Sequence, residues 1–256
     1  MEHQKLLMED ENLNKFLTLL DENGLGDHKQ DLIYLGQYID QMESSLNDVL
    51  NELKLVRTEL SDIQDKTIKA TAIRAVDKVT TKVEQAKDTV IKVKEHIKYT
   101  VRKAVQDFKQ HGTSALVLGL NTIKAKELLV GIKNQCNKIL ENTDKEIDKL
   151  TTLGDEIHKT NTHLKNVGRT LIGKDVQEID KRNPNTGLLS KIQICLFKVM
   201  EVSSQMIDKT DKVSHKLQSF EENVKEKKSV KSELNQIKQS KINDKVKSSK
   251  EIVREK

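Results

Sequence analysis

Apolar residues recur along most of the chain at alternating spacings of three and four positions. The longest regular run has ten members, all apolar. This spacing is the a/d pattern of a heptad repeat, and a helix that carries it must pack its apolar stripe against another helix. We call this run the first stripe. It is the predicted helix-pairing surface and consists of Leu32, Leu35, Ile39, Met42, Leu46, Val49, Leu53, Val56, Leu60 and Ile63.

A second run with the same spacing extends from Ala72 to Ile97, after a phase slip around residues 66–71. A slip of this kind resembles a stutter, which unwinds a supercoil locally without ending the helix. No glycine or proline occurs between Gly36 and Gly112. The simplest interpretation is one helix from about residue 27 to residue 110. A break near the slip is the alternative, because the β-branched residues that follow it lower the helix propensity.

The remaining segments complete the predicted organisation. Residues 1–26 carry a short amphipathic helix that ends at a glycine turn. Residues 27–175 form a long antiparallel helical hairpin with its turn at 111–113, and the return helix spans roughly residues 114–170. A polar loop with the only proline follows at 176–187. A C-terminal helix is expected over 188–220, and a Lys-rich tail, frayed or disordered, over 221–256.

Composition excludes most other fold classes. Of 256 residues, ten are glycine, one is proline and 33% are charged. All-β and doubly wound α/β folds need a turn about every ten to fifteen residues, so this chain has too few turn-forming residues for them. A hydrophobic content of 35% is also too low to fill the core of one large globule. We therefore expect an all-α protein, an elongated coiled coil or thin antiparallel helical bundle with one very long helix.

Charge is distributed unevenly along the chain. Residues 1–65 have a net charge of −10 and residues 66–111 a net charge of +7, within a total of +5. The basic stretch has two alternative explanations besides nucleic-acid binding. One is a solvated helix face, and the other is antiparallel pairing of two copies of the long helix, centred near residue 67, which would lay acidic residues on basic ones. Candidate contacts to nucleic-acid phosphates or to an acidic partner are Lys69, Arg74, Lys78, Lys82, Lys98 and Arg102.

Residue patterns that carry chemistry are weak in this sequence. Residues 168–174 match GxxxxGK, but a phosphate-binding loop needs a preceding strand and a hydroxyl after the lysine, and here Asp175 follows Lys174. We interpret this segment as the end of a helix. The seven histidines form no cluster with metal-ligand spacing. Cys136 and Cys195 are predicted to be small buried hydrophobes in a reducing cytosol, with a disulfide or a catalytic thiol as alternatives. We expect no enzymatic activity, no metal and no cofactor.

Nothing in the sequence suggests a membrane segment. The longest apolar stretch is far shorter than the roughly 20 residues that a membrane-spanning helix needs. The N-terminus has no apolar region typical of a secretory signal. These observations predict a cytoplasmic protein with no membrane span.

Three segments that interrupt the heptad periodicity are the most distinctive, and they are Asn12–Leu17 with Glu22–Leu25, Phe108–Leu116, and His163–Arg169. Together they resemble an uncharacterised family of long-helical proteins from conjugative or other mobile elements of Gram-positive gut bacteria. The resemblance covers roughly residues 12–175. It implies a bacterial cytoplasmic setting and supplies no activity or functional residue.

Two functional hypotheses follow. The first is a non-enzymatic coiled-coil scaffold or assembly protein that acts through helix–helix pairing, with itself as a homo-oligomer or with another coiled-coil protein. The alternative is an accessory nucleic-acid-binding protein of a mobile element, which uses the basic 66–111 helix and the tail.

Overall fold

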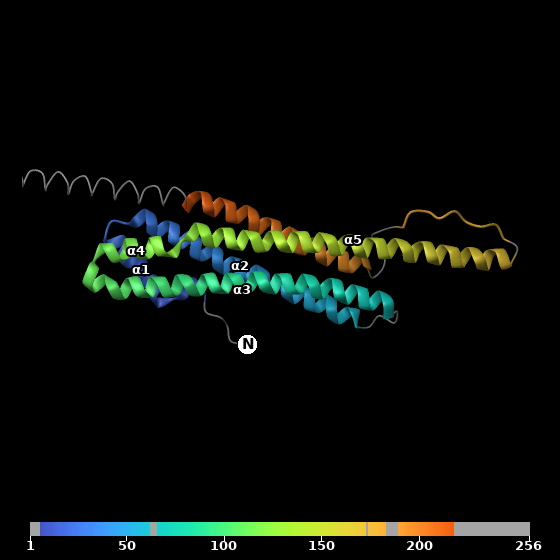
Figure 1. Ribbon diagram of the computed structural model, residues 1–256, viewed down its shortest axis with the longest axis horizontal. Helices are drawn as coiled ribbons and strands as arrows, with labels where there is room; N and C mark the ends of the chain where they lie inside the picture. Colours follow the sequence, from blue (N-terminus) through green and yellow to red (C-terminus); the bar gives the residue numbers. More distant parts are fainter. Residues whose placement is uncertain (1–5, 62–65, 173, 183–188, 218–256) are drawn as a thin grey trace, which may run out of the picture.

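The computed structural model describes residues 6–61, 66–172, 174–182 and 189–217, and nearly all of them are helical. No strand occurs within these ranges, so the all-α class predicted from the sequence is confirmed (Figure 1). Residues 189–217 form a C-terminal helix. The other elements, in chain order, are η1 (Leu7–Glu9), α1 (Glu11–Glu22), α2 (Gly26–Leu60), α3 (Lys66–His111), α4 (Thr113–Ile123) and α5 (Ala125–Leu171).

Helices α2 and α3 lie side by side and antiparallel. Glu43 pairs with Lys94 across 2.6 Å, and Arg57, further along α2, pairs with Asp77, which is earlier in α3. The segment expected to be one helix over 27–110 is therefore two helices that fold back on each other, and residues 62–65 lie outside the described ranges. The position midway in sequence between the partners of each ion pair is close to residue 67. The antiparallel pairing that was considered for two copies of the long helix is therefore formed between α2 and α3 of a single copy.

The remaining helices close a four-helix bundle. Helix α5 runs back along α3, and the helix over 189–217 runs back along α5 and α2 (Figure 1). Lys133 of α5 pairs with Asp211 across 2.6 Å, and the Tyr38 hydroxyl of α2 donates a hydrogen bond to the Met206 carbonyl across 2.9 Å. Neighbouring helices alternate in direction, which is the up-down-up-down topology of antiparallel bundles. Helix α1 packs against α3 and α2 near one end of this bundle.

The return helix, expected to be continuous over roughly 114–170, breaks at Lys124. This residue has a φ of 50°, in the left-handed region, and separates α4 from α5. Ile123 and Leu129 are buried six positions apart, whereas Val130, at the heptad spacing of seven, is half exposed. The left-handed residue therefore resets the phase of the apolar stripe, which costs roughly 1–2 kcal/mol of backbone strain.

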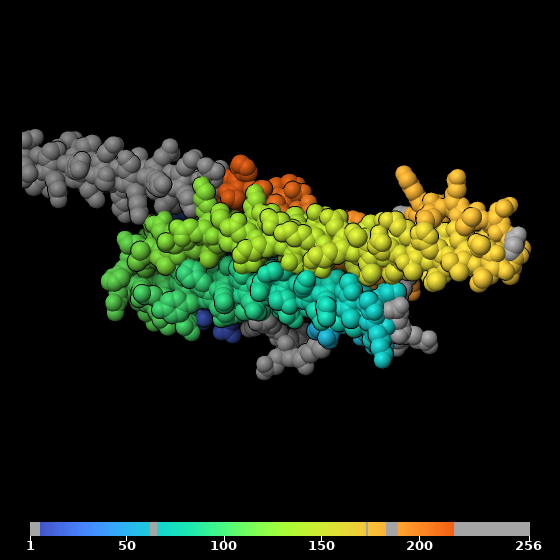
Figure 2. All heavy atoms as spheres, turned by 45° about the vertical axis from the view of Figure 1, so that its right-hand side comes forward, coloured from blue at the N-terminus to red at the C-terminus, as the bar shows by residue number. Residues whose placement is uncertain are grey.

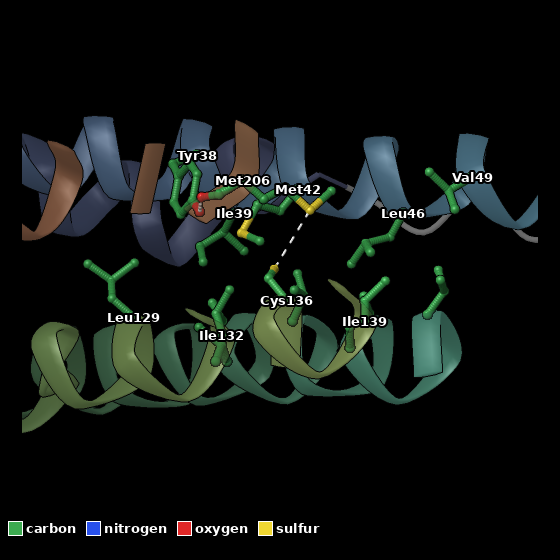
Figure 3. Packing of buried hydrophobic residues seen from close by; sticks show 14 of the residues in the cluster. Tyr38, Ile39, Met42, Leu46, Val49, Leu129, Ile132, Cys136, Ile139 and Met206 are labelled. Carbon is green, nitrogen blue, oxygen red and sulfur yellow. Dashed lines mark hydrogen bonds between the residues drawn. The ribbon is translucent and has the colours of Figure 1, made fainter. Parts of the chain in front are cut away.

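The first stripe is buried inside the chain. Its members pack against the other helices of the bundle, and Figure 3 shows several of them facing Ile132, Cys136 and Ile139 of α5. Val56 is only partly buried, and Ile63 lies outside the described residues. The remaining eight are buried, with exposures of 7% or less, and they are Leu32, Leu35, Ile39, Met42, Leu46, Val49, Leu53 and Leu60. The apolar partner that the pattern requires is thus supplied by the same chain.

A buried ionic cluster joins three elements of the bundle. The Lys94 side chain is fully buried, and its Nζ lies 2.6 Å from Glu43 Oε2 and 3.5 Å from Asp40 Oδ1. The Asp40 carboxylate also accepts hydrogen bonds from the backbone N–H groups of Leu7, across 2.7 Å, and Met8, across 3.0 Å. The cluster therefore ties α3 to α2 and α2 to η1. Buried charges are tolerated only when they are paired and hydrogen-bonded in this way.

We predict that Lys94→Met lowers the free energy of unfolding by about 3–5 kcal/mol, because the substitution leaves two buried carboxylates without a cation. Urea unfolding followed by circular dichroism measures this change. The matched control is Lys98→Met, since Lys98 pairs with Glu95, which is 61% exposed. The control is expected to lose no more than about 1 kcal/mol. Equal stability of the Lys94→Met variant and the wild type would contradict the prediction.

Candidate functional site

Helix α5 extends beyond the other helices of the bundle at the end opposite the α3–α4 turn (Figures 1 and 2). Helix α3 has 46 residues, whereas α4, Lys124 and α5 together cover residues 113–171. Helix α3 ends and α4 begins at the turn around Gly112. About 13 residues at the end of α5, roughly 20 Å at 1.5 Å per residue, therefore extend past the start of α3. We call residues 158–172 the overhang.

An extended segment, residues 174–182, runs back along α5 and is hydrogen-bonded to it. The Asn166 side chain donates to the Gln177 carbonyl and accepts from the Gln177 N–H, each across 2.8 Å. Arg169 Nε donates to the Asp175 carbonyl across 2.6 Å. The segment was expected to be a loop, and these contacts show that its described part is fixed to the overhang. Residues 183–187 of the expected loop lie outside the described ranges.

The return of this segment to the bundle is held at Gly154. The Arg182 guanidinium lies against the glycine, so closely that a Cβ there would be 2.5 Å from Arg182 Cζ. Arg182 Nε also lies 2.9 Å from Asp155 Oδ1. Gly154, which lies within the continuous helix α5, therefore makes room for a side chain of the extended segment.

We predict that Gly154→Ala displaces Arg182, because the new methyl group occupies the position of the guanidinium. Trypsin is then expected to cleave after Arg182 several-fold faster than in the wild type. Gly168→Ala is the matched control in the same helix, since a Cβ there meets nothing within 4 Å. The control should leave the cleavage rate unchanged. Identical rates in Gly154→Ala and the wild type would show that the contact does not hold the segment.

Apolar side chains are concentrated on the overhang and the segment beside it. Leu164 and Leu171 continue the seven-residue spacing of Leu150, a core residue, and Ile157, but they are 65% and 82% exposed. Val167, Val176 and Ile179 line a groove between the helix and the extended segment. Six of the fourteen exposed large hydrophobic residues in the described chain lie here, and they are Leu164, Val167, Leu171, Ile172, Val176 and Ile179. Apolar patches of this kind mark interaction sites on soluble proteins.

Charge on the overhang is of one sign. Lys159 and Lys165 are exposed, Arg169 is half-buried, and no aspartate or glutamate occurs between Ile157 and Ile172. Lys165 and Arg169 are four residues apart, so they lie on the same side of the helix. The overhang therefore combines an open apolar stripe with cations on the other faces of the helix, beside an extended segment that carries Asp175, Glu178 and Asp180.

The basic residues proposed for nucleic-acid contacts on α3 are mostly engaged within the chain. Lys78 pairs with Glu146 across 3.2 Å and Lys98 with Glu95 across 3.1 Å. Three others have partners as well: Lys69 donates to the Ser61 carbonyl, Lys82 donates to Gln85 Oε1, and the Arg102 guanidinium lies over the Tyr99 ring. Arg74 is exposed. The tail that was grouped with these residues lies outside the described ranges.

The GxxxxGK segment lies at the end of α5. Gly168 is helical and no strand precedes it in the described chain, while Gly173 lies outside the described residues. The helix-end interpretation agrees with this position. Within the same ranges, no group of three or more His, Cys, Asp or Glu side chains is placed to hold a metal ion.

Cys136 and Cys195 are free and buried. Burial raises the pKa of the Cys136 thiol to about 12 and that of the Cys195 thiol to about 11. Cys136 Sγ lies 3.9 Å from Met206 Sδ, inside the core (Figure 3). Both thiols therefore belong to the bundle interior, as the sequence indicated.

We predict that neither thiol reacts appreciably with an aromatic disulfide reagent at about pH 8 in the native protein, because both stay protonated and covered. In about 6 M guanidinium chloride both should react within the mixing time. Absorbance of the released thiolate counts them. Rapid reaction of one thiol in the native state would contradict its burial.

Residues 9–256 match the model of a family described as a family of unknown function (DUF6674). The chain belongs to this family. The match extends past residue 175, where the resemblance seen in the sequence ended, and includes the C-terminal helix and the tail. No curated protein and no solved structure matches the chain significantly. None of the helices in the described part of the chain is long and apolar enough to cross a membrane.

Leu164 and Leu171 keep the seven-residue spacing of Leu150 and Ile157, but spacing alone did not show that they are exposed. Their exposure depends on where α3 begins. The sequence between α2 and α3 contains no glycine or proline, so it does not mark the position of this fold-back. One available indication was the absence of acidic residues between 157 and 172 in a chain that is 33% charged.

Proposed function

We propose that this protein is a non-enzymatic scaffold or assembly protein that binds another protein by helix pairing at the overhang. The observation that carries the proposal is the continuation of the core stripe of α5 beyond the bundle, where Leu164 and Leu171 are mostly exposed. Helix pairing was the function favoured by the heptad pattern. The surface proposed for it now differs, because the first stripe is already covered by the chain itself.

Exposed apolar surface of this extent is unfavourable in water, and the folding of this chain alone does not explain why it is present. Six large apolar side chains within sixteen residues favour aggregation unless a partner covers them. The extended segment could have covered them, yet it is held by polar contacts and adds Val176 and Ile179 to the exposed set.

Two further expectations belong to this proposal. The resemblance of the sequence suggests that the protein serves a mobile element in the cytoplasm of a bacterium. Nucleic-acid binding through α3 receives less support, because five of its six candidate cations have partners within the chain. Self-association remains an expectation, but the first stripe no longer supports it, because that stripe is buried within the chain.

The test is a comparison of binding partners in the native host. The tagged double variant Leu164→Ser with Leu171→Ser is expected to lose at least one partner that the wild-type protein retains, because the apolar stripe is gone. The control is Leu55→Ser with Leu118→Ser, which changes two leucines that are 66% and 63% exposed elsewhere. The control should keep every partner. If the overhang variant also keeps every partner, the proposal fails.

A further inference from the structure

We infer that the overhang pairs with the overhang of a second copy of the chain, with the two helices antiparallel and related by a twofold axis. This inference rests on the proposed function and identifies the partner in it. Its basis is the face of α5 that is uncovered, the sequence of residues on that face, and the length of the overhang.

The uncovered face of the overhang is the face that α3 covers elsewhere along α5. Glu146 of α5 pairs with Lys78 of α3 across 3.2 Å. Leu164 comes 18 residues after Glu146, which is five turns of 3.6 residues, so the two side chains lie on the same face of the helix. Leu164 lies past the start of α3 and is 65% exposed (Figure 1). A helix in the line of α3, antiparallel to α5 as α3 is, would therefore complete this face.

The seam of the overhang alternates leucine with smaller residues. Asn161, Leu164, Gly168 and Leu171 follow one another at spacings of three, four and three residues, which is the a/d spacing of a heptad. In an antiparallel pair, an a position of one helix faces a d position of the other. A twofold axis near residue 166 then places Leu164 opposite the second copy's Gly168, and Leu171 opposite its Asn161. Nothing lies within 4 Å of the Cβ position at Gly168, so the seam is complementary to itself in this register.

The length of the overhang favours nearly the same register. Because Lys78 pairs with Glu146 and the helices are antiparallel, the start of α3, 12 residues before Lys78, lies level with about residue 158 of α5. An overhang that fills the line of α3 must end where α3 starts. Ile172 of one copy would then lie level with about residue 158 of the other, and the twofold axis would pass near residue 165. This is close to the position that the seam requires.

The borders of the seam are compatible with this pairing. In an antiparallel twofold pair, each border meets the same border of the other helix. Val167 forms one border and is 59% exposed, so two copies would cover each other's valine. Lys165 forms the other border and is exposed, so the repulsion between the two lysines is small. Arg169 is directed away from the seam and donates to the Asp175 carbonyl.

The expected dimer is weak, because the paired surface is short. An overlap of about 13 residues, roughly 20 Å of helix, falls in the class of small interfaces that bury less than about 1,200 Å² in total. Interfaces of this size are typical of weak and transient complexes. We therefore expect a dissociation constant of about 10 µM.

Sedimentation velocity of the full-length protein between about 1 and 200 µM tests the pairing. The wild type is expected to dimerise over this range, and Leu164→Ser with Leu171→Ser should remain monomeric. The control pair Leu55→Ser with Leu118→Ser should dimerise like the wild type. Small-angle X-ray scattering should show a dimer nearly twice as long as the monomer, because the two bundles extend from the overhangs in opposite directions. A wild type that stays monomeric throughout the range overturns the inference.

Two complementary charge variants test the register. Leu164→Glu and Gly168→Lys should each dimerise at least tenfold more weakly than the wild type, because each places an unpaired charge in the seam. An equimolar mixture should form a heterodimer at least tenfold tighter than either homodimer, since the new carboxylate of one chain faces the new ammonium group of the other. The mixture of Leu171→Glu with Gly168→Lys is the control and should gain nothing, because position 171 faces position 161.

Both positions tolerate these changes in a single chain, since Leu164 is exposed and the space at Gly168 is open. Circular dichroism checks that each variant is folded. A mixture of the Leu164→Glu and Gly168→Lys variants that stays monomeric overturns the inference.

The outcomes also separate this inference from the proposed function. A monomeric wild type whose Leu164→Ser, Leu171→Ser variant still loses a native partner would assign the overhang to a different protein. That result overturns the second copy and leaves helix pairing at the overhang in place. A dimer that survives the same double substitution is formed elsewhere on the chain and overturns this inference, and the comparison of native partners then decides the proposed function independently.

Discussion

Burial of continuous apolar stripes is the constraint on which this structure depends. Each long helix carries an apolar residue at every third or fourth position, and such a helix is stable in water only when that face is covered. The chain satisfies the constraint by folding α2 back on α3 and by returning α5 and the helix over 189–217 along them. Since only 35% of the residues are hydrophobic, nearly all of the core comes from these stripes, and a thin bundle needs fewer apolar residues to fill its core than a globule would.

The same constraint makes the overhang conspicuous. Because α3 begins at Lys66, the stripe of α5 has no partner in the described chain beyond about residue 158, yet leucine continues at the heptad positions 164 and 171. A helix end that had no role beyond folding would be expected to carry polar residues there, as in the capping repeats of stacked helical proteins. The extended segment that returns along this end is fixed by Asn166 and Arg182 and leaves the leucines open.

Much of the fold could be predicted because heptad spacing reports directly on which residues are buried. Eight of the ten residues of the first stripe are buried as the spacing predicted, and the turn expected at 111–113 lies at Gly112, where φ is positive. A break near the phase slip was only the alternative to one long helix, and the break at Lys124 was not predicted, because neither uses glycine or proline and tertiary packing decided them. Lys94 could not be recognised as buried either, since nothing in the sequence distinguishes it from Lys92, an exposed lysine on the same helix.

The two kinds of charge in this protein act differently because their exposure to water differs. Lys94, Asp40 and Glu43 are removed from solvent, so a wrong pairing between α2 and α3 would leave an uncompensated charge in the core. These residues therefore fix the register of the hairpin. Lys165 on the overhang is exposed, so it contributes little energy on its own, and an apolar stripe without buried charges accepts almost any amphipathic helix.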